Sequence, residues 1–349
     1  MINRPRCFLA ALAASSLFIV AGYLPGAAAQ DYYKDKVIRI IVGYRVGGGY
    51  DVYTRVVSRH LGKHIPGNPT IVVENMDGAG SLRAANYVFN RADPDGLTLG
   101  VFGGGLVTQQ ALGEKGLRFD ARKFHWIGSM SEGTPACVIM GFTGINTFDE
   151  VLNSKKELRF GSTGPGSTTD DLPKLLIGLF NAKINVIRGY GGTSAVRVGM
   201  QRKELDGACW TWESIRTTAR AMLDDKGENR LIPFAIEGRY PDPETKQVPQ
   251  ISARIKDPSD LAAFKAWLNP YVFFRPVVAP PKVTKDKVEL LRSALKKTME
   301  DREFLAEAEK GKLDVGFTSG EEVAKYVAEV VNTPASAVEK LGTMIGRKN

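Results

Sequence analysis

Short apolar runs alternate with helix-length segments along the first part of the chain. A run at 37–43 (VIRIIVG) has the pattern of a buried strand, and apolar residues at helical spacing follow over 51–61. Two further strands are expected at 70–74 and 97–102, on either side of a helix at 81–90. Strands that alternate with helices of this size predict a parallel α/β architecture.

The same alternation restarts after residue 142, which predicts a second α/β unit. Helix and strand are expected to alternate over 147–152, 159–161, 171–180, 184–187, 193–201 and 205–210. A segment rich in proline and charge at 240–258 is expected to be a surface excursion, and 271–275 is expected to be a strand. Three helices are expected at the end of the chain, over 285–301, 321–331 and 335–344.

This layout predicts two hinged lobes, each a sheet flanked by helices, with the C-terminal helices returning to lobe one. The boundaries follow from the points at which the pattern restarts. Lobe one is expected to comprise 30–142 and 277–349, and lobe two 143–276.

The first residues have the pattern of a secretory signal peptide over 1–29. Arg4 and Arg6 precede an apolar run, and Ala27-Ala28-Ala29 offers the small side chains that signal peptidase recognises. A retained membrane anchor is the alternative, but an apolar run of about 18 residues is marginal for spanning a bilayer. The mature chain is therefore expected to be exported.

Composition removes several functional classes. Three Cys exclude a disulfide scaffold or Cys-rich metal module, and three His leave little room for a His-based metal centre. The net charge of +9 is compatible with anionic partners, but Lys and Arg are interspersed with acids, which disfavours nucleic acid. Cys137 and Cys209 each lie in an apolar stretch, so two separate buried thiols are expected rather than a bridge, although export permits pairing.

Glycine-rich turns follow strands at four places, 47–49, 103–105, 161–168 and 189–193. Such turns let backbone N–H groups converge on an anion at a helix N-terminus, and ligands of open α/β sheets bind at this end of the strands. The third turn matches the phosphate-binding pattern except that Ser167 replaces its lysine, which favours a carboxylate over a nucleotide. One such turn is ordinary loop chemistry, whereas two in each lobe predict an anion site.

The sequence contains no recognisable constellation of catalytic residues, so we predict that the protein is not an enzyme and has no metal site and no cofactor. His60 and His64 have zinc-binding spacing, but no Glu follows His60, and Gly62 and Pro66 disturb the helix. Asp170-Asp171 is expected to interact with a helix dipole rather than to bind a metal.

At this point the chain resembles the Bug family, the periplasmic substrate-binding proteins of tripartite tricarboxylate transporters. The resemblance rests on IRIIVGYRVGGGYDVYTRVVSRHLG, VVENMDGAGSLRAANYV and ADPDGLTLG, then on FGSTGPGST and YVFFRPVVAPPKVTKDKVELL, and it spans essentially the whole mature chain. It implies a Venus-flytrap fold, a carboxylate held between the lobes by the turns 44–49 and 162–169, and docking of a monomer to membrane permease subunits.

The resemblance and the glycine turns together give a set of expected ligand-binding residues. They are Tyr44, Arg45, Gly47, Gly48, Gly49, Asp51, Gly104, Gly105, Ser162, Ser167, Thr168, Thr169, Tyr190, Gly191 and Trp210. For Asp51 the alternative is an ion pair with Arg55 at i+4. Arg45, uncharged in the family pattern, is expected to contact the ligand or the opposite lobe.

Departures from the family pattern leave the ligand open between aliphatic di- or tricarboxylates and aromatic acids. Tyr44, Tyr50, Trp210 and Trp212 are able to stack on an aromatic acid. We expect Ser167 to bind the ligand and Thr169 to cap the following helix, with Thr168 undecided. Two other functions remain as alternatives: a sensory protein that presents a carboxylate to a membrane kinase, and an exported enzyme.

Overall fold

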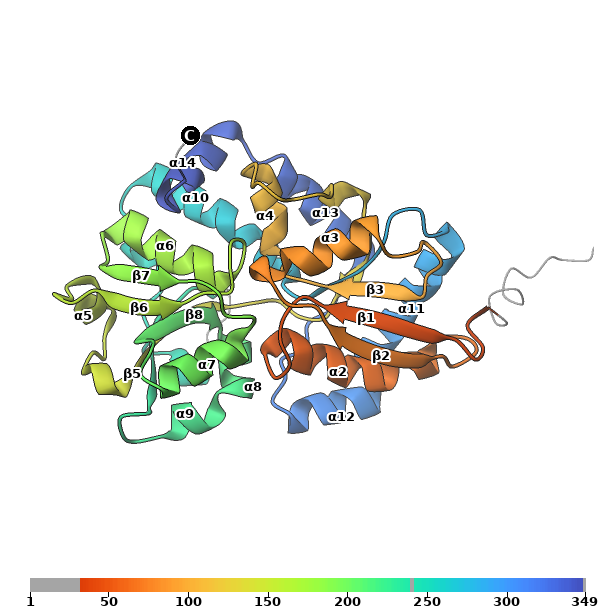
Figure 1. Ribbon diagram of the computed structural model, residues 1–349, viewed down its shortest axis with the longest axis horizontal. Helices are drawn as coiled ribbons and strands as arrows, with labels where there is room; N and C mark the ends of the chain where they lie inside the picture. Colours follow the sequence, from red (N-terminus) through yellow and green to blue (C-terminus); the bar gives the residue numbers. More distant parts are fainter. Residues whose placement is uncertain (1–31, 239–241, 348–349) are drawn as a thin grey trace, which may run out of the picture.

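The computed structural model describes residues 32–238 and 242–347, which form two α/β lobes side by side (Figure 1). The predicted signal peptide at 1–29 lies outside the described residues. Within the described ranges, no helix combines the length and the apolar character that crossing a membrane requires. The expected fold class, two lobes that each contain a sheet flanked by helices, is confirmed.

The first lobe contains a six-stranded mixed sheet in the order β11-β4-β10-β3-β1-β2. Its strands are β1 (Val37–Val42), β2 (Thr70–Asn75), β3 (Thr98–Val101), β4 (His125–Ser129), β10 (Pro276–Ala279) and β11 (Thr318–Ser319). Strand β1 pairs in parallel with β2 and β3, and the remaining pairs are antiparallel. Its helices are α2 (Gly49–Leu61), α3 (Leu82–Asn90), α4 (Gly105–Ala111), α11 (Lys285–Met299), α12 (Arg302–Lys310) and α13 (Gly320–Val331).

The second lobe contains a five-stranded sheet in the order β7-β6-β8-β5-β9. Its strands are β5 (Pro135–Met140), β6 (Leu158–Gly161), β7 (Ile184–Ile187), β8 (Gly207–Thr211) and β9 (Leu231–Ile236). Its helices are α5 (Phe148–Leu152), α6 (Thr168–Phe180), α7 (Thr193–Gln201), α8 (Trp212–Thr218), α9 (Arg220–Asp224) and α10 (Pro258–Leu268). Short 3-10 helices connect elements of both lobes, at Gly62–His64, Ala79–Ser81, Ala121–Lys123, Gly141–Thr143, Pro243–Thr245, Ser252–Arg254 and Asn269–Phe273.

The chain first crosses between the lobes earlier than expected. Strand β5 already belongs to the second sheet, so the first crossing falls before residue 135 rather than at 142. The expected strand at 271–275 is wrong, because Asn269–Phe273 forms a 3-10 helix with Pro270 in its first turn. Proline suits that position because the first helical N–H has no intrahelical partner. The returning strand is β10, which begins one residue after Arg275.

The last helix, α14 (Ala335–Met344), corrects the expected course of the C-terminus. Helices α11 to α13 return to the first lobe as expected, but α14 packs against α10 and α6 of the second lobe (Figure 1). A Cβ atom added to Gly178 of α6 would lie 2.2 Å from the backbone oxygen of Met344. Arg347 then donates from Nη1 to the backbone oxygen of Leu112 at 2.8 Å, so the C-terminal segment contacts both lobes.

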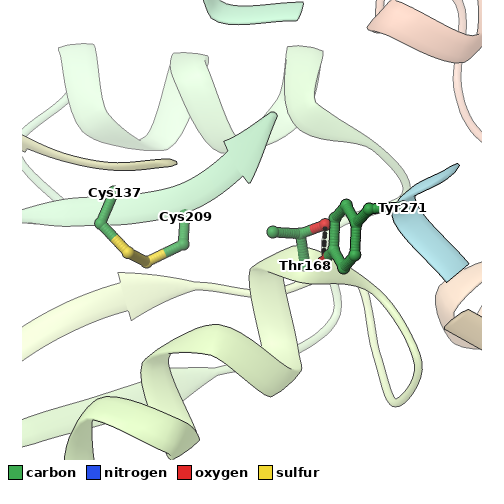
Figure 2. The surroundings of a disulfide bond; sticks show 4 residues. All are labelled: Cys137, Thr168, Cys209 and Tyr271. Carbon is green, nitrogen blue, oxygen red and sulfur yellow. Dashed lines mark hydrogen bonds between the residues drawn. A yellow bond between two sulfur atoms is a disulfide. The ribbon is translucent and has the colours of Figure 1, made fainter. Parts of the chain in front are cut away.

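Cys137 and Cys209 form a disulfide in the middle of the second sheet (Figure 2). The expectation of two separate thiols was wrong. Both side chains are fully buried, as their apolar neighbours in the sequence indicate, but the antiparallel register of β5 and β8 places Cys137 directly opposite Cys209. Directly opposed residues bring their side chains together on one face of the sheet, and this register is not visible in the sequence.

Candidate functional site: a pocket between the lobes

A pocket lies where the two lobes meet, at the ends of strands from both sheets. The first lobe and the hinge contribute Tyr44, Gly48, Gly49, Tyr50, Gly103 and Phe274. The second lobe contributes Thr163, Gly166, Ser167, Thr168, Thr169, Thr193, Trp210, Thr211 and Ser214. This lining contains hydroxyls, glycines and aromatic rings and no acidic side chain. The cavity in this arrangement of the lobes is about 40 Å³, which is room for a few water molecules.

Three helices begin at the pocket. Residues 48–50 belong to the start of α2, residues 167–169 to the start of α6, and Thr193 is the first residue of α7. None of these helices has a side-chain cap, and the first N–H groups of a helix lack intrahelical partners. Together with the positive end of the helix dipole, such N–H groups favour a bound anion.

The hydroxyls at the start of α6 have different partners. The Oγ of Ser167 donates to the backbone oxygen of Gly164 at 2.6 Å, and Thr168 shares a hydrogen bond with the hydroxyl of Tyr271 at 2.8 Å (Figure 2). The Oγ1 of Thr169 accepts from the backbone N–H of Thr163 at 2.9 Å. The expected capping by Thr169 is wrong, because α6 begins at Thr168, three residues earlier than predicted, and Thr169 lies within its first turn.

Alanine substitutions at Thr169 and Ser167 are expected to affect different properties, the first the stability of the fold and the second the affinity for the ligand. Thr169→Ala leaves the buried N–H of Thr163 without its partner and should lower the free energy of unfolding by about 1–3 kcal/mol. Ser167→Ala should weaken carboxylate binding by about 1–3 kcal/mol. The reason is that the Ser167 hydroxyl, which donates to the oxygen of Gly164 here, would donate to the ligand carboxylate instead. Urea unfolding and calorimetric titration measure the two quantities. A Ser167→Ala protein with unchanged affinity would remove Ser167 from the ligand contacts.

Aromatic side chains form one wall of the pocket. The ring centroids of Tyr44 and Tyr50 are 4.6 Å apart, and those of Tyr50 and Phe274 are 5.2 Å apart. Burial raises the pKa of Tyr44 to about 12 and that of Tyr50 well above its usual range, so both remain neutral phenols. The indole Nε1 of Trp210 is buried without a hydrogen-bond partner among the described residues, which leaves it as an available donor beside the pocket.

Two hydroxyls of the second lobe connect the pocket to a buried cation. Thr211 and Ser214 lie 3.1 Å apart, oxygen to oxygen. The Nη2 of Arg275 donates to the Oγ of Ser214 at 2.6 Å and to the Oγ1 of Thr211 at 3.3 Å. The pocket therefore contains no charged side chain, but a guanidinium lies directly behind two of its hydroxyls.

Several residues expected to bind the ligand lie outside the pocket lining. Asp51 pairs with Arg55 at 2.8 Å, which confirms the alternative suggested for it, and it also accepts from the backbone N–H of Gly47 at 2.9 Å. The Oγ of Ser162 donates to Asp170 at 2.7 Å. Both carboxylates therefore have their partners within their own lobe.

Arg45 lies at the rim of the pocket. Its backbone N–H donates to the oxygen of Gly191 at 3.1 Å, so it contacts the opposite lobe, one of the two outcomes expected for it. Its guanidinium Nε lies 3.3 Å from a carboxylate oxygen of Asp77, a partner that the local sequence does not indicate. Tyr190 also lies outside the lining and packs against an apolar cluster of the second lobe that includes Val196, Met200 and Leu205.

The glycine turns bring the lobes together as well as lining the pocket. A Cβ atom on Gly105 would lie 2.2 Å from the oxygen of Gly166 in the opposite lobe, and Gly104 faces the segment around Phe273. The backbone N–H of Gly80 donates across the interface to the oxygen of Thr163 at 2.8 Å. Part of the glycine signal in the sequence therefore reports close approach of the lobes rather than ligand contact.

Asp171 forms a further contact between the lobes. Its Oδ2 accepts from the Nε2 of Gln109 at 3.0 Å, which joins α6 to α4. Complete burial raises the pKa of Asp171 to about 7, and the neighbouring charge of Asp170 acts in the same direction. This carboxyl belongs to the interface and does not line the pocket.

Eight lining residues are absent from the expected set of ligand-binding residues, although Tyr50 was named there as able to stack on an aromatic acid. Five lie in or beside the predicted glycine turns but were not selected: Tyr50, Gly103, Thr163, Gly166 and Thr193. Thr211, Ser214 and Phe274 come from the end of β8, from α8 and from the hinge. Nothing in their local sequence places them together, because the return of the chain to the first lobe creates this corner of the pocket.

The two histidines of α2 and its extension lie beside carboxylates: the Nε2 of His60 is 2.6 Å from Glu307, and the Nε2 of His64 is 3.0 Å from Asp301. His60, Asp301 and Glu303 bring potential metal-ligating atoms together, within the part of the chain that the structure describes. The ammonium of Lys63 lies 3.0 Å from Asp301 and 2.6 Å from Glu303, so a protein cation already neutralises these carboxylates.

Comparison with known proteins agrees with this architecture. No protein-family model matches the chain. It is 24% identical over 348 residues to the UPF0065 protein in the gbd 5' region of Cupriavidus necator, which covers 95% of this chain and 96% of that protein. The structure of the periplasmic binding protein BugD is similar with a TM-score of 0.74 and 19% identity, covering 90% of this chain and 99% of BugD.

MatC from Rhodopseudomonas palustris, determined with bound malate, is also similar. Its TM-score is 0.69 at 19% identity, and the match covers 89% of this chain and 99% of MatC. The similarity to BugD agrees with the resemblance to the Bug family seen in the sequence, and the chain has the two-lobe fold of BugD and MatC.

Proposed function

We propose that this protein is a periplasmic solute receptor that binds a small organic carboxylate between its lobes and delivers it to a tripartite tricarboxylate-type membrane transporter. One observation carries the proposal. The pocket combines uncapped helix N-termini and hydroxyls with a cation behind them, and its lining contains no acidic side chain. Such a site offers hydrogen-bond donors and positive potential to an anion.

The relatives and the disulfide support this proposal. MatC was determined with malate, a small dicarboxylate. The Cys137–Cys209 disulfide fits an oxidising compartment such as the periplasm, where such bonds persist. The sensory alternative shares the same fold and pocket, and no observation favours it. The rings of Tyr44, Tyr50 and Phe274 offer a stacking surface to an aromatic acid, whereas MatC was determined with an aliphatic one, so both classes belong in the test.

The protein is expected to bind carboxylates and not the corresponding amides. A carboxylate accepts several charge-assisted hydrogen bonds from the pocket, whereas an amide brings an NH₂ group toward donors. A thermal-shift panel of malate, adipate, citrate and benzoate, each beside its amide, measures this difference, because a ligand that binds the folded protein raises its melting temperature. Calorimetric titration then gives the affinity. Equal shifts for an acid and its amide, or no shift with any of the four acids, would contradict the proposal.

A further inference from the structure

Arg275 is a fully buried arginine at the hinge. It lies between the 3-10 helix at Asn269–Phe273 and strand β10, where the chain passes from the second lobe back to the first. Its relative exposure is 0%. A guanidinium remains charged in proteins, and burying a charge costs free energy unless the charge is paired.

No carboxylate pairs with this guanidinium. Among residues 32–238 and 242–347, none lies within 4.0 Å of it. Its hydrogen-bond partners are the hydroxyls of Ser131, Thr211 and Ser214, and its Nε has no partner. The Cζ of Arg275 lies 3.9 Å from the ring centroid of Tyr53, a cation–π contact that stabilises the charge without neutralising it.

Glu213 is the buried acid adjacent to these hydroxyls in the sequence, and its hydrogen bond is to a backbone group rather than to Arg275. Its Oε2 accepts from the backbone N–H of Thr134 at 3.1 Å. Burial raises the pKa of Glu213, against the opposing influence of Arg275, so its neutral form is favoured more than that of an ordinary glutamate. The positive charge behind the pocket is therefore not balanced by a close carboxylate of the described chain.

The hydroxyls of Ser214 and Thr211 lie between Arg275 and the pocket, and they relay the influence of its positive charge through hydrogen bonds. A hydroxyl has one hydrogen and two lone pairs, and Ser214 and Thr211 use lone pairs to accept from Nη2. One of them donates to the other across 3.1 Å, which leaves one hydroxyl hydrogen without an assigned acceptor. Both residues line the pocket, so an acceptor placed there receives that hydrogen, and hydrogen bonds in such a chain strengthen one another.

From this arrangement we infer that Arg275 makes the pocket selective for an anion, by polarising Ser214 and Thr211 toward a ligand carboxylate that serves as its missing counter-charge. Arg275 is a positioning residue, because a layer of hydroxyls separates it from the ligand. This inference rests on the proposed function and adds the residue that determines the charge of the ligand.

The selectivity between acid and amide tests this role. Wild type, Arg275→Met and Arg275→Lys are titrated with malate, adipate, citrate and benzoate and with the four amides. Arg275→Met should reduce the preference for the acid about 10- to 100-fold, the value of one hydrogen bond to a charged group. Arg275→Lys keeps the positive charge and should restore part of the preference. Wild-type preference retained in Arg275→Met would overturn the inference.

Two further variants keep the result interpretable. Arg197→Met is the matched control, because the Nη2 of Arg197 donates to the oxygen of Gly47 across the lobe interface at 3.0 Å and does not contact a pocket hydroxyl. It should lower the affinities for acid and amide together and leave their ratio unchanged. If Arg275→Met does not fold, Ser214→Ala tests the same chain of hydrogen bonds from the pocket side and should reduce the ratio as well. An unchanged ratio in Ser214→Ala would also overturn the inference.

The two proposals fail in different ways. If wild type binds none of the acids, or binds acid and amide equally, the proposed function fails before any variant is made. If wild type prefers the acid and Arg275→Met keeps that preference, the receptor function stands and the role of Arg275 is refuted.

Discussion

Replacing Gly49 by alanine is expected to weaken carboxylate binding by about 1–3 kcal/mol, which is roughly 5- to 150-fold in the dissociation constant. Gly49 is the first residue of α2 in the first lobe. A Cβ atom there would lie 2.0 Å from the Oγ and 2.7 Å from the Cβ of Ser214 in the second lobe. Real Cβ atoms do not approach this closely, so the lobes of the variant must remain further apart.

The same substitution should leave the ligand-free protein nearly as stable as wild type. Each lobe has its own sheet and a cluster of buried apolar side chains that a lobe displacement leaves intact. A larger apolar cluster continues from one lobe to the other through the hinge, so a small decrease in the ligand-free melting temperature is expected. Calorimetric titration with the panel acid that binds wild type, together with ligand-free melting, measures both effects. The neighbouring Gly48→Ala is the matched control, because its Cβ would lie 3.1 Å from the Oγ1 of Thr193, a contact that a small shift relieves.

Two results would contradict this account of Gly49. Unchanged affinity in Gly49→Ala would show that the ligand does not need the close approach of α2 to Ser214. A large fall in ligand-free melting temperature would show that the glycine matters for folding rather than for closure. The double variant with Ser214→Gly removes the clashing atoms and should bring the lobes together again, which small-angle scattering measures as a smaller radius of gyration.

The pattern of apolar positions was sufficient to predict most of the regular elements. Strand β1 and helix α2 fall within two residues of their expected bounds, because a buried strand and an amphipathic helix each impose their own period on the sequence. The course of α14 was not predictable in this way. Its period indicates a helix, but the choice between the first lobe and α6 depends on contacts such as that of Gly178 with Met344.

For the pocket, too, one part was predictable from the sequence and another part was not. Glycine turns after strands located the pocket, since ligands of α/β sheets bind beyond these strand ends. The turns did not distinguish residues that line the pocket, such as Gly49, from residues such as Gly105 that meet the opposite lobe. Ser214 and Arg275 were not predictable, because they are separated by 61 residues and meet only where the chain crosses between the lobes.

Breaking the disulfide is expected to cause the largest loss of stability. In the chain-entropy account, a cross-link between residues 72 apart stabilises the folded state by about 4 kcal/mol, and removal of native disulfides costs about 2–5 kcal/mol. The double variant Cys137→Ala/Cys209→Ala should therefore unfold at a much lower urea concentration than the oxidised wild type. Wild type unfolded in the presence of reductant should approach the variant.

Binding provides the second measurement for this variant. Trp210 and Thr211 follow Cys209 directly on β8 and line the pocket, but neither of the two sulfur atoms does. The backbone pairing of β5 with β8 persists without the cross-link, so carboxylate affinity should stay close to that of wild type well below the melting temperature. Reductant should change the unfolding of wild type and leave that of the double variant unaltered. If reductant does not shift the wild-type transition, the cross-link does not stabilise this sheet, and the argument from the β5–β8 register fails.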